Sequence, residues 1–163
     1  MNIVLRAADS SDADFLLELY RETRSGEMAN WGWTKEQEDS FLRLQYKARE
    51  QSYAAQFPGA SDSIILTDDE MIGRMLVAEL EDEFRLVDIA IVSRSQRRGV
   101  GTMMIRRLLA SAADSGKPVR LHVGVLNPAK ELYARLGFQK IRENGGSFLM
   151  ELVAGSRTSG LKD

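Results

Sequence analysis

The sequence predicts an α/β fold: a central, mixed and mostly antiparallel twisted sheet of about seven strands, flanked by about four helices. Apolar residues follow helical spacing in some segments and form short continuous runs in others. Strand-like runs follow one another after the second helical segment, with acidic turns between them, which indicates antiparallel neighbours. Beyond residue 99, helix and strand patterns alternate until a hairpin pattern closes the sheet.

The first strand and the first helix are predicted near the start of the chain. Residues 3–5 form a short apolar run that is typical of a strand. Residues 9–11 offer helix N-caps, because Asp and Ser side chains accept hydrogen bonds from the first backbone amides of a helix. Four large residues then follow at helical spacing: Phe15, Leu16, Leu19 and Tyr20.

Thr34 is predicted to begin a second helix, with Gln37 at the position that completes a capping box. A looser link over residues 27–33 separates the two helices. The second helix is expected to end at Pro58-Gly59. Its spacing places four residues on one face: Phe41, Leu44, Ala48 and Gln51.

The pattern then changes to that of strands. Residues 63–66 and 71–77 flank the turn Asp68-Asp69-Glu70, which predicts a hairpin. Residues 84–92 form another strand after the acidic turn at residues 81–83.

Gly99 is predicted to open a long helix that ends at Gly116-Lys117-Pro118. Its apolar spacing gives an expected buried stripe of Val100, Met103, Met104, Leu108 and Ala112.

The C-terminal part is predicted to complete the sheet. Residues 119–123 form a strand, and residues 128–136 form a short helix with proline in its first turn and Gly137 as its C-terminal cap. Residues 138–141 and 148–153 are typical of a closing hairpin around Asn144-Gly145-Gly146, and residues 154–163 are expected to be disordered.

Composition is that of an ordinary globular protein and excludes several kinds of site. The 163 residues fit a single domain, expected over residues 1–153. Basic residues number 22 and acidic residues 24, so neither nucleic acid nor a membrane is expected as a partner. Cysteine is absent, which removes a catalytic thiol and fits a cytoplasmic location. His122 is the single histidine, and no metal site is expected.

A glycine-containing turn lies between the strand at residues 84–92 and the long helix. Gly99 and Gly101 allow a ligand to approach the backbone closely. The first turn of a helix presents unpaired N–H groups and the positive end of the helix dipole, which suits a pyrophosphate. Taken alone, the two glycines are more typical of a tightly packed strand-to-helix turn than of a ligand-binding turn. A dinucleotide site is disfavoured because its third glycine would fall at Met104, and a P-loop is excluded because no Gly-Lys-Ser/Thr follows.

The run QRRGVG at residues 96–101 resembles the Gln/Arg-x-x-Gly-x-Gly/Ala signature of the GCN5-related N-acetyltransferase (GNAT) superfamily. The resemblance implies a GNAT-type fold and binding of acetyl-CoA as a co-substrate, without a metal. It assigns the CoA pyrophosphate to the turn and the pantetheine arm to the preceding strand. The implied binding residues are Ile89, Ile91, Gln96, Arg97, Arg98, Gly99, Val100, Gly101 and Thr102. The family often has proline where this chain has Ser93.

A second run, NPAKELYARLGF at residues 127–138, resembles the second signature of the same family. There the asparagine bonds the CoA arm and the tyrosine lies near the CoA sulfur, which implies these roles for Asn127 and Tyr133. The Asn-to-Ala spacing is one residue shorter here than in the commonest form. Taken alone, Tyr133 would fit a core aromatic residue; two motifs in the right order favour a catalytic role.

Acyl transfer to an amine requires proton movements that two side chains can provide. An alkylammonium with a pKa near 10.4 costs roughly 4–5 kcal/mol to deprotonate at pH 7, so a base or a water chain is needed. His122 is the first candidate, with Asp88 and Glu79 as alternatives and a buried structural histidine as the other interpretation of His122. A phenol can protonate the departing thiolate, which suits Tyr133.

The resemblance places the acceptor beside the first two helices and their link. The candidate residues there are acidic or aromatic, which suits a cationic amine; Glu27, Trp33, Tyr53 and Asp88 are assigned to it, beside Trp31 and Gln45. The acceptor is expected to be a small-molecule or peptide amine, and a homodimer stays open. Transfer of a longer acyl group and a catalytically silent CoA-binding module are the alternatives.

Overall fold

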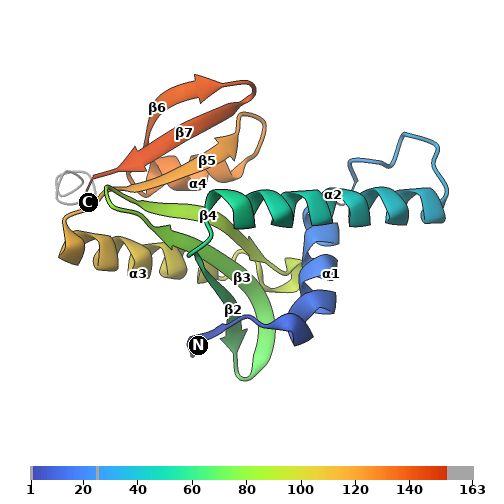
Figure 1. The fold of residues 1–163 in the computed structure, drawn as a ribbon, viewed down its shortest axis with the longest axis horizontal. Helices are drawn as coiled ribbons and strands as arrows, with labels where there is room; N and C mark the ends of the chain where they lie inside the picture. Colours follow the sequence, from blue (N-terminus) through green and yellow to red (C-terminus); the bar gives the residue numbers. More distant parts are fainter. Residues whose placement is uncertain (1, 25, 154–163) are drawn as a thin grey trace. The chain divides into compact units, whose positions relative to one another are not determined.

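The computed structural model describes residues 2–24 and 26–153, so the tail expected to be disordered lies outside the described residues. The predicted α/β class is confirmed: within these described ranges one mixed sheet has seven strands in the order β1-β2-β3-β4-β5-β7-β6, accompanied by four α-helices (Figure 1). The strands are β1 (Ile3–Ala7), β2 (Ser61–Thr67), β3 (Glu70–Glu79), β4 (Phe84–Ile91), β5 (Val119–Gly124), β6 (Gln139–Asn144) and β7 (Ser147–Leu152). The helices are α1 (Ala13–Thr23), α2 (Lys35–Gln56), α3 (Val100–Ser115) and α4 (Ala129–Arg135).

The chain divides into two compact units. Unit 1 comprises Met1–Leu76 and Asp88–Arg98, and unit 2 comprises Val77–Val87 and Gly99–Asp163. Strands β3 and β4 contribute to both. None of the described helices has both the length and the apolar character that a membrane crossing requires.

Unit 1 contains the antiparallel N-terminal strands. Ile3 of β1 pairs with Thr67 of β2, and Ala7 pairs with Ser63. The predicted turn between β2 and β3 is confirmed, with Asp68 and Asp69 both at positive φ, as two-residue hairpin turns require.

Strands β3 and β4 approach closely at one position in unit 1. A Cβ added to Gly73 would lie 2.4 Å from the carbonyl oxygen of Ala90. Only glycine fits at this point of the strand without movement of the backbone.

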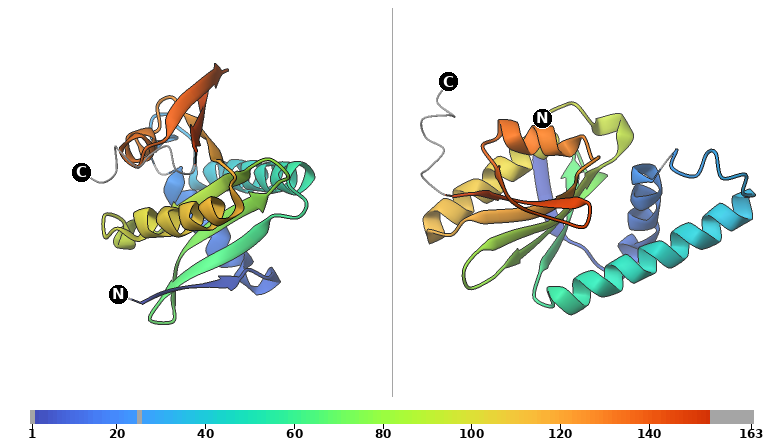
Figure 2. Two further views of the ribbon diagram at one scale, coloured as in Figure 1. Left: turned by 90° about the vertical axis from the view of Figure 1, so that its left-hand side faces the viewer. Right: turned by 90° about the horizontal axis from the view of Figure 1, so that it is seen from above.

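Helices α1 and α2 pack against each other in unit 1 (Figures 1 and 2). The capping box at Thr34 is confirmed, since its Oγ1 accepts from Gln37 N and Gln37 Oε1 accepts from Thr34 N. Asp9 caps a short 3-10 helix, Ser10–Asp12, which precedes α1.

The packed face of α2 differs from the one suggested by apolar spacing. Leu44 is 65% exposed, whereas Leu42 is buried and Tyr46, Arg49 and Tyr53 are half-buried. Tyr46, Arg49 and Tyr53 recur every three or four residues, so they share one side of the helix. Apart from the buried Leu42, the residues on this side of α2 are therefore polar or aromatic, and apolar spacing does not detect them.

Unit 2 is built around β5. The beginning of β4 pairs with it in parallel, from Phe84 opposite Val119 to Leu86 opposite Leu121. On its other side β5 pairs antiparallel with β7, which forms the predicted closing hairpin with β6 (Figure 1). Helices α3 and α4 both contact β5.

Helix α3 begins and ends at glycines in the left-handed conformation, Gly99 with φ 82° and Gly116 with φ 69°. Four residues of the predicted stripe are buried. Met103 is only half-buried, and Ile105 is fully buried in its place.

Candidate functional site

The turn before α3 has a backbone shape that few residues can adopt. Gly99 is the N-cap of α3, and Arg97, two residues earlier, also has a positive φ of 65°. A Cβ built on Gly99 or on Gly101 would meet no atom within 4 Å. The amides of the first helical turn have no partners within the helix. Open space thus lies beside a helix N-terminus that favours an anion.

Of the three side chains that precede Gly99, one makes a structural hydrogen bond and two are exposed to solvent. Gln96 Nε2 donates to the carbonyl oxygen of Ile91, 2.8 Å away, which ties the turn to the end of β4. Arg97 and Arg98 are exposed. The glutamine therefore has a structural contact, while the arginines extend into solvent, where they could meet phosphate oxygens.

Ser93 makes a specific contact, at the position where the GNAT signature that this chain resembles often has proline. Its backbone N–H and its Oγ both donate to Glu22 Oε1 of α1, at 2.8 and 3.1 Å. Proline has no N–H to donate. The difference from the family pattern therefore accompanies an additional connection between α1 and the segment after β4.

The second motif forms the start of α4 and a buried ring. Asn127 is exposed, and its Oδ1 accepts from Ala129 N, 2.9 Å away. Tyr133 is 9% exposed and meets Phe138 edge to face, with ring centroids 5.9 Å apart. Leu136 is buried, whereas Leu132 is only half-buried. The local fold thus fixes the ring of Tyr133.

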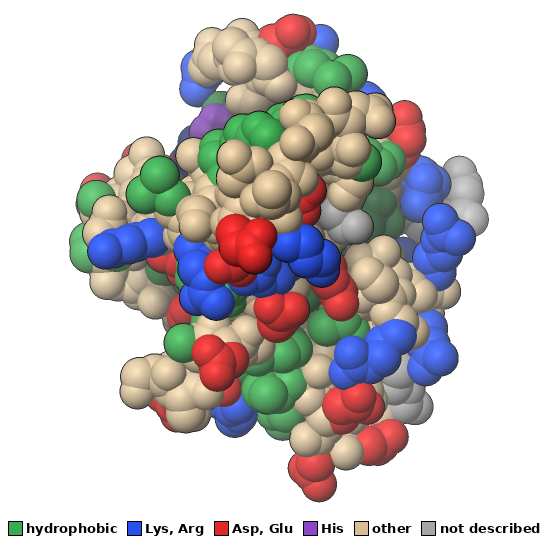
Figure 3. Space-filling model, turned by 90° about the vertical axis from the view of Figure 1, so that its right-hand side faces the viewer, with side chains coloured by type: hydrophobic (Ala, Val, Ile, Leu, Met, Phe, Trp, Pro, Cys, Tyr) green, Lys and Arg blue, Asp and Glu red, His purple; other side chains and the backbone are tan. Residues whose placement is uncertain are grey.

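His122 lies on the exposed face of β5, while its neighbours Leu121 and Val123 are buried. It is the purple side chain at the surface in Figure 3. Its Nδ1 lies 3.4 Å from Arg85 Nη1. Partial burial, followed by the positive charges of Arg85 and Arg142, lowers the pKa of His122. The interpretation of His122 as a buried structural residue is wrong, and the imidazole is largely neutral at pH 7.

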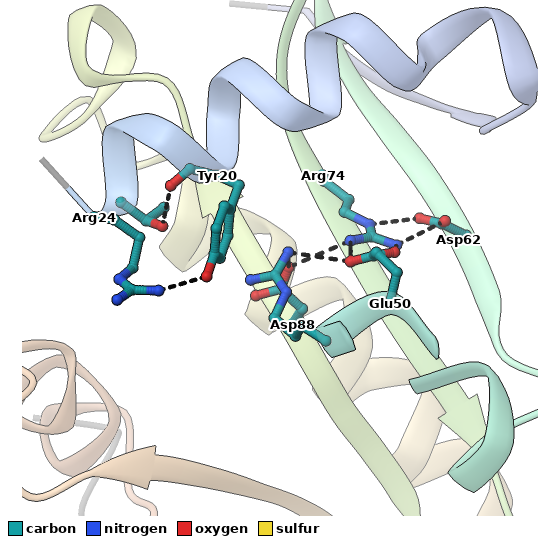
Figure 4. A network of polar contacts seen from close by, with 8 residues as sticks. Tyr20, Arg24, Glu50, Asp62, Arg74 and Asp88 are labelled. Atoms are coloured by element: carbon teal, nitrogen blue, oxygen red, sulfur yellow. Dashed lines mark hydrogen bonds and ion pairs between the residues drawn. The ribbon is translucent and has the colours of Figure 1, made fainter. Parts of the chain in front are cut away.

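Asp88 belongs to a network of ionic side chains in unit 1 (Figure 4). At its centre Arg74, only 3% exposed, donates two hydrogen bonds to Glu50 and two to Asp62, at 2.7–2.9 Å. These bonds raise the pKa of Arg74 although burial acts against them. Asp88 Oδ2 lies 3.8 Å from both Arg74 Nη1 and Arg49 Nη2. Burial raises the pKa of the Asp88 carboxyl.

Arg49 joins this network to the aromatic residues. Its guanidinium carbon lies 4.7 Å from the ring centroid of Tyr20, 5.2 Å from that of Tyr53 and 5.8 Å from that of Tyr46. Burial raises the pKa of Tyr53, and the negative charge of Asp88 adds to this effect. Of the predicted acceptor residues, the structure therefore brings Tyr53 and Asp88 to the same network.

The remaining predicted acceptor residues lie elsewhere in unit 1. Trp33 packs edge to face against Trp31 and Phe41 and borders a cavity of about 490 Å³. Glu27 is exposed and pairs with Arg24 at 2.7 Å.

The alternative base Glu79 belongs to unit 2, where it pairs with Lys117 at 3.2 Å.

Sequence reasoning missed five charged or aromatic residues of this network: Tyr46, Arg49, Glu50, Asp62 and Arg74. Two signals could have found all of them except Asp62. Tyr46, Arg49, Glu50 and Tyr53 recur at helical spacing, and Arg74 interrupts an otherwise apolar strand. A charge in such a strand indicates a buried, paired group, because an unpaired charge is too costly to bury.

Residues 14–138 match the model of the acetyltransferase (GNAT) family. Over 92 residues the chain is 36% identical to the mycothiol acetyltransferase of Actinosynnema mirum, which corresponds to 53% of this chain and 31% of that protein. The chain thus matches about a third of the length of that curated relative.

Solved structures share the fold. The PaiA N-acetyltransferase from Thermoplasma acidophilum, in complex with coenzyme A, superposes with a TM-score of 0.71 and 19% identity, covering 94% of this chain and 99% of that one. The ribosomal-protein-S18-alanine N-acetyltransferase from Escherichia coli superposes with a TM-score of 0.60 and 17% identity, covering 95% and 96%.

Proposed function

Because the chain belongs to the GNAT family of acetyltransferases, we propose that it transfers the acetyl group of acetyl-CoA to a primary amine by direct attack in a ternary complex. The catalytic domain in this proposal is residues 1–153. The acceptor is a small molecule or a peptide. Relatives named for mycothiol and for an alanine of a ribosomal protein support both kinds of acceptor.

The turn before α3 is the observation that carries the proposal. Gly99 is left-handed, and the space that a Cβ would enter at Gly99 and Gly101 is open. A pyrophosphate fits this environment, because backbone amides can reach its oxygens and no side chain obstructs them. The coenzyme A complex of a protein with this fold adds support. In the proposal Val100 and Thr102 supply further backbone amides.

Two other segments would hold the rest of the co-substrate. The parallel pairing of β4 with β5 covers Phe84–Leu86, and Ile89 and Ile91 lie beyond it. Their backbone is assigned to the pantetheine arm. The Oδ1 atom of Asn127 already accepts from the chain, so this side chain would contact the arm as a donor through its amide nitrogen.

Acetyl-CoA supplies an activated thioester, and the protein supplies proton transfers. His122 is assigned as the base that removes a proton from the acceptor ammonium, since its lowered pKa keeps it neutral at working pH. Tyr133 is assigned as the acid that protonates the departing thiolate. Its ring is held by Phe138, so its hydroxyl has a fixed position. Asp88, Glu79 and water are the other bases that this proposal admits.

The direct test is release of free thiol from acetyl-CoA in the presence of a panel of amines and peptides. Turnover on any amine supports the proposal, and mass spectrometry of the product locates the acetyl group. Acetyl-CoA binding without turnover on the whole panel would favour a silent binding module. Faster turnover with a longer acyl-CoA would change the assigned donor.

A further inference from the structure

A cluster of aromatic rings and carboxylates surrounds Arg49 in unit 1. We define the tyrosine–carboxylate box as Tyr20, Tyr46, Tyr53, Glu50 and Asp88, drawn from α1, α2 and β4. The rings lie 4.7–5.8 Å from the guanidinium carbon. The carboxylates of Glu50 and Asp88 lie 3.2 and 3.8 Å from Arg49 Nη2. Ring faces and carboxylates both attract cations, so this environment selects a positive charge.

The guanidinium of Arg49 uses only part of its hydrogen-bonding capacity in this environment. Its Nε is buried and has no hydrogen-bond partner among the described residues. Its Nη2 donates one hydrogen bond of 3.2 Å to Glu50 Oε2, and its distance to Asp88, 3.8 Å, is longer than a hydrogen bond. Glu50 also accepts two hydrogen bonds from Arg74, of 2.7 and 2.8 Å.

Arg74, in the same network, makes many more hydrogen bonds to carboxylates than Arg49 does. All three of its nitrogens donate to Glu50 or Asp62. Together these two carboxylates balance Arg74 and leave one excess negative charge. Arg49 and Asp88 then form a looser pair, in which the guanidinium makes one hydrogen bond of 3.2 Å to Glu50 and otherwise contacts three ring faces. A guanidinium held this way can be exchanged for another cation.

A cavity borders the box and offers room for such an exchange. Its volume is about 180 Å³, and Glu50 and Tyr53 line it together with Arg74, Asp62 and Phe57 near the end of α2. Two residues of the box therefore face space that a ligand chain or the displaced Arg49 side chain could occupy.

We infer that the tyrosine–carboxylate box is a binding site for an alkylammonium group of the acceptor, and that Arg49 is an internal cation that the ligand displaces. An ammonium is smaller than a guanidinium and can direct N–H donors to both carboxylates while its alkyl chain contacts the rings. The inference rests on the proposed function only in naming the ligand as acceptor. Anionic and neutral ligands are excluded by the same chemistry.

The test measures binding of butylammonium without acetyl-CoA, by calorimetry, in wild type and in Arg49→Met. Methionine keeps apolar contact with the rings and removes the competing charge. Butylammonium should bind about tenfold more tightly to Arg49→Met, and the added Asp88→Asn change should remove most of that gain. Arg43→Met is the matched control, since Arg43 lies on α2, is 61% exposed and pairs with Asp39. Butanol should not bind to any variant.

A second measurement needs no variant. In wild type, butylammonium should shift the NMR resonances of the Arg49 side chain at millimolar concentration and leave those of Arg43 in place. The inference is overturned if Arg49→Met binds no more tightly than wild type, or, where that variant does not fold, if Arg49 does not respond. Because acetyl-CoA is absent, either failure leaves the thiol-release test of the acetyltransferase proposal unaffected.

Discussion

Tyr133 and His122, the two residues assigned to proton transfer, occupy different environments. Tyr133 is buried on a short helix with its ring against Phe138. His122 is exposed on a strand beside the cation of Arg85. A buried hydroxyl can be aimed at one atom, whereas an exposed imidazole can exchange protons with solvent. These environments match the proposed roles of acid and base.

Tyr133→Phe should preserve the fold and reduce turnover. The substitution removes one hydroxyl and keeps the ring contact with Phe138, so thermal stability and acetyl-CoA affinity should change little. Loss of a general acid should lower kcat by roughly 10²–10⁴-fold. Timed thiol-release assays measure kcat, and calorimetry measures the affinity for acetyl-CoA. Wild-type turnover in this variant would assign the acid to water or to the acceptor itself.

His122→Gln should change the pH dependence of the reaction. A base must be neutral, and the pKa of His122 is lowered. The wild-type kcat/KM should therefore rise with pH through an inflection below the ordinary histidine value of about 6.5. The variant should lose this inflection and be most impaired near neutral pH. An identical profile in both proteins would transfer the base role to Asp88, Glu79 or water.

Asp88→Asn should alter stability in a pH-dependent way. The folded protein binds a proton at Asp88 more tightly than the unfolded chain does, because burial raises this pKa. The resulting stabilisation is present below the ordinary carboxyl pKa of about 3.9 and is lost as pH rises through the folded value. Relative to the Asp88→Asn variant, wild type should therefore lose stability as pH rises above about 3.9. Urea unfolding at several pH values measures the difference, and a constant difference would contradict the prediction.

At the scale of elements, the turn between β4 and α3 combines three constraints. Gly99 and Arg97 have positive φ, Gln96 bonds back to Ile91, and Ser93 bonds to Glu22 on α1. The turn is thus fixed by contacts on the β4 side while the α3 side faces open space. This is the arrangement expected of a backbone that binds a ligand without rearranging.

Gly101→Val should weaken acetyl-CoA binding more than it affects folding. Gly101 lies in the first turn of α3, and a Cβ there meets nothing within 4 Å. The added side chain would occupy space that the pyrophosphate requires. Gly99→Val should behave similarly but also strain the left-handed backbone, at about 1–2 kcal/mol. Calorimetry measures the affinity for acetyl-CoA, and thermal melts measure the stability of the fold. A folded Gly101→Val protein with wild-type affinity would place the pyrophosphate elsewhere.

For the whole molecule, binding of the proposed co-substrate is linked to folding. A ligand bound only by the native state shifts the folding equilibrium by mass action. Ligand binding is therefore expected to affect the unfolding of the entire chain.

Acetyl-CoA should raise the melting temperature, whereas NAD and ATP should raise it much less. At a concentration 100 times Kd the stabilisation is about 2.7 kcal/mol, which corresponds to roughly 5–10 °C for a chain of this size. Differential scanning fluorimetry with the three ligands makes the comparison. A larger shift with NAD than with acetyl-CoA would contradict the assigned co-substrate.

The order and type of the elements follow from local patterns in the sequence. The Thr34 capping box, the Asp68-Asp69 turn and the Gly99 helix start depend on residues close in the chain, so local rules identify them. The two family motifs lie on the predicted elements for the same reason.

Contacts between side chains that are distant in the sequence depend on the tertiary fold. Arg49, Arg74 and Asp88 come from a helix and two strands, and their charges can be buried only because the fold brings them together. Apolar spacing suggested the wrong face for α2, since that helix packs through tyrosines and an ionic network and leaves Leu44 exposed. The pKa shifts of His122 and Asp88 likewise depend on burial and on charges distant in sequence. Local patterns specify backbone conformation, whereas pairing between distant charges depends on the complete fold.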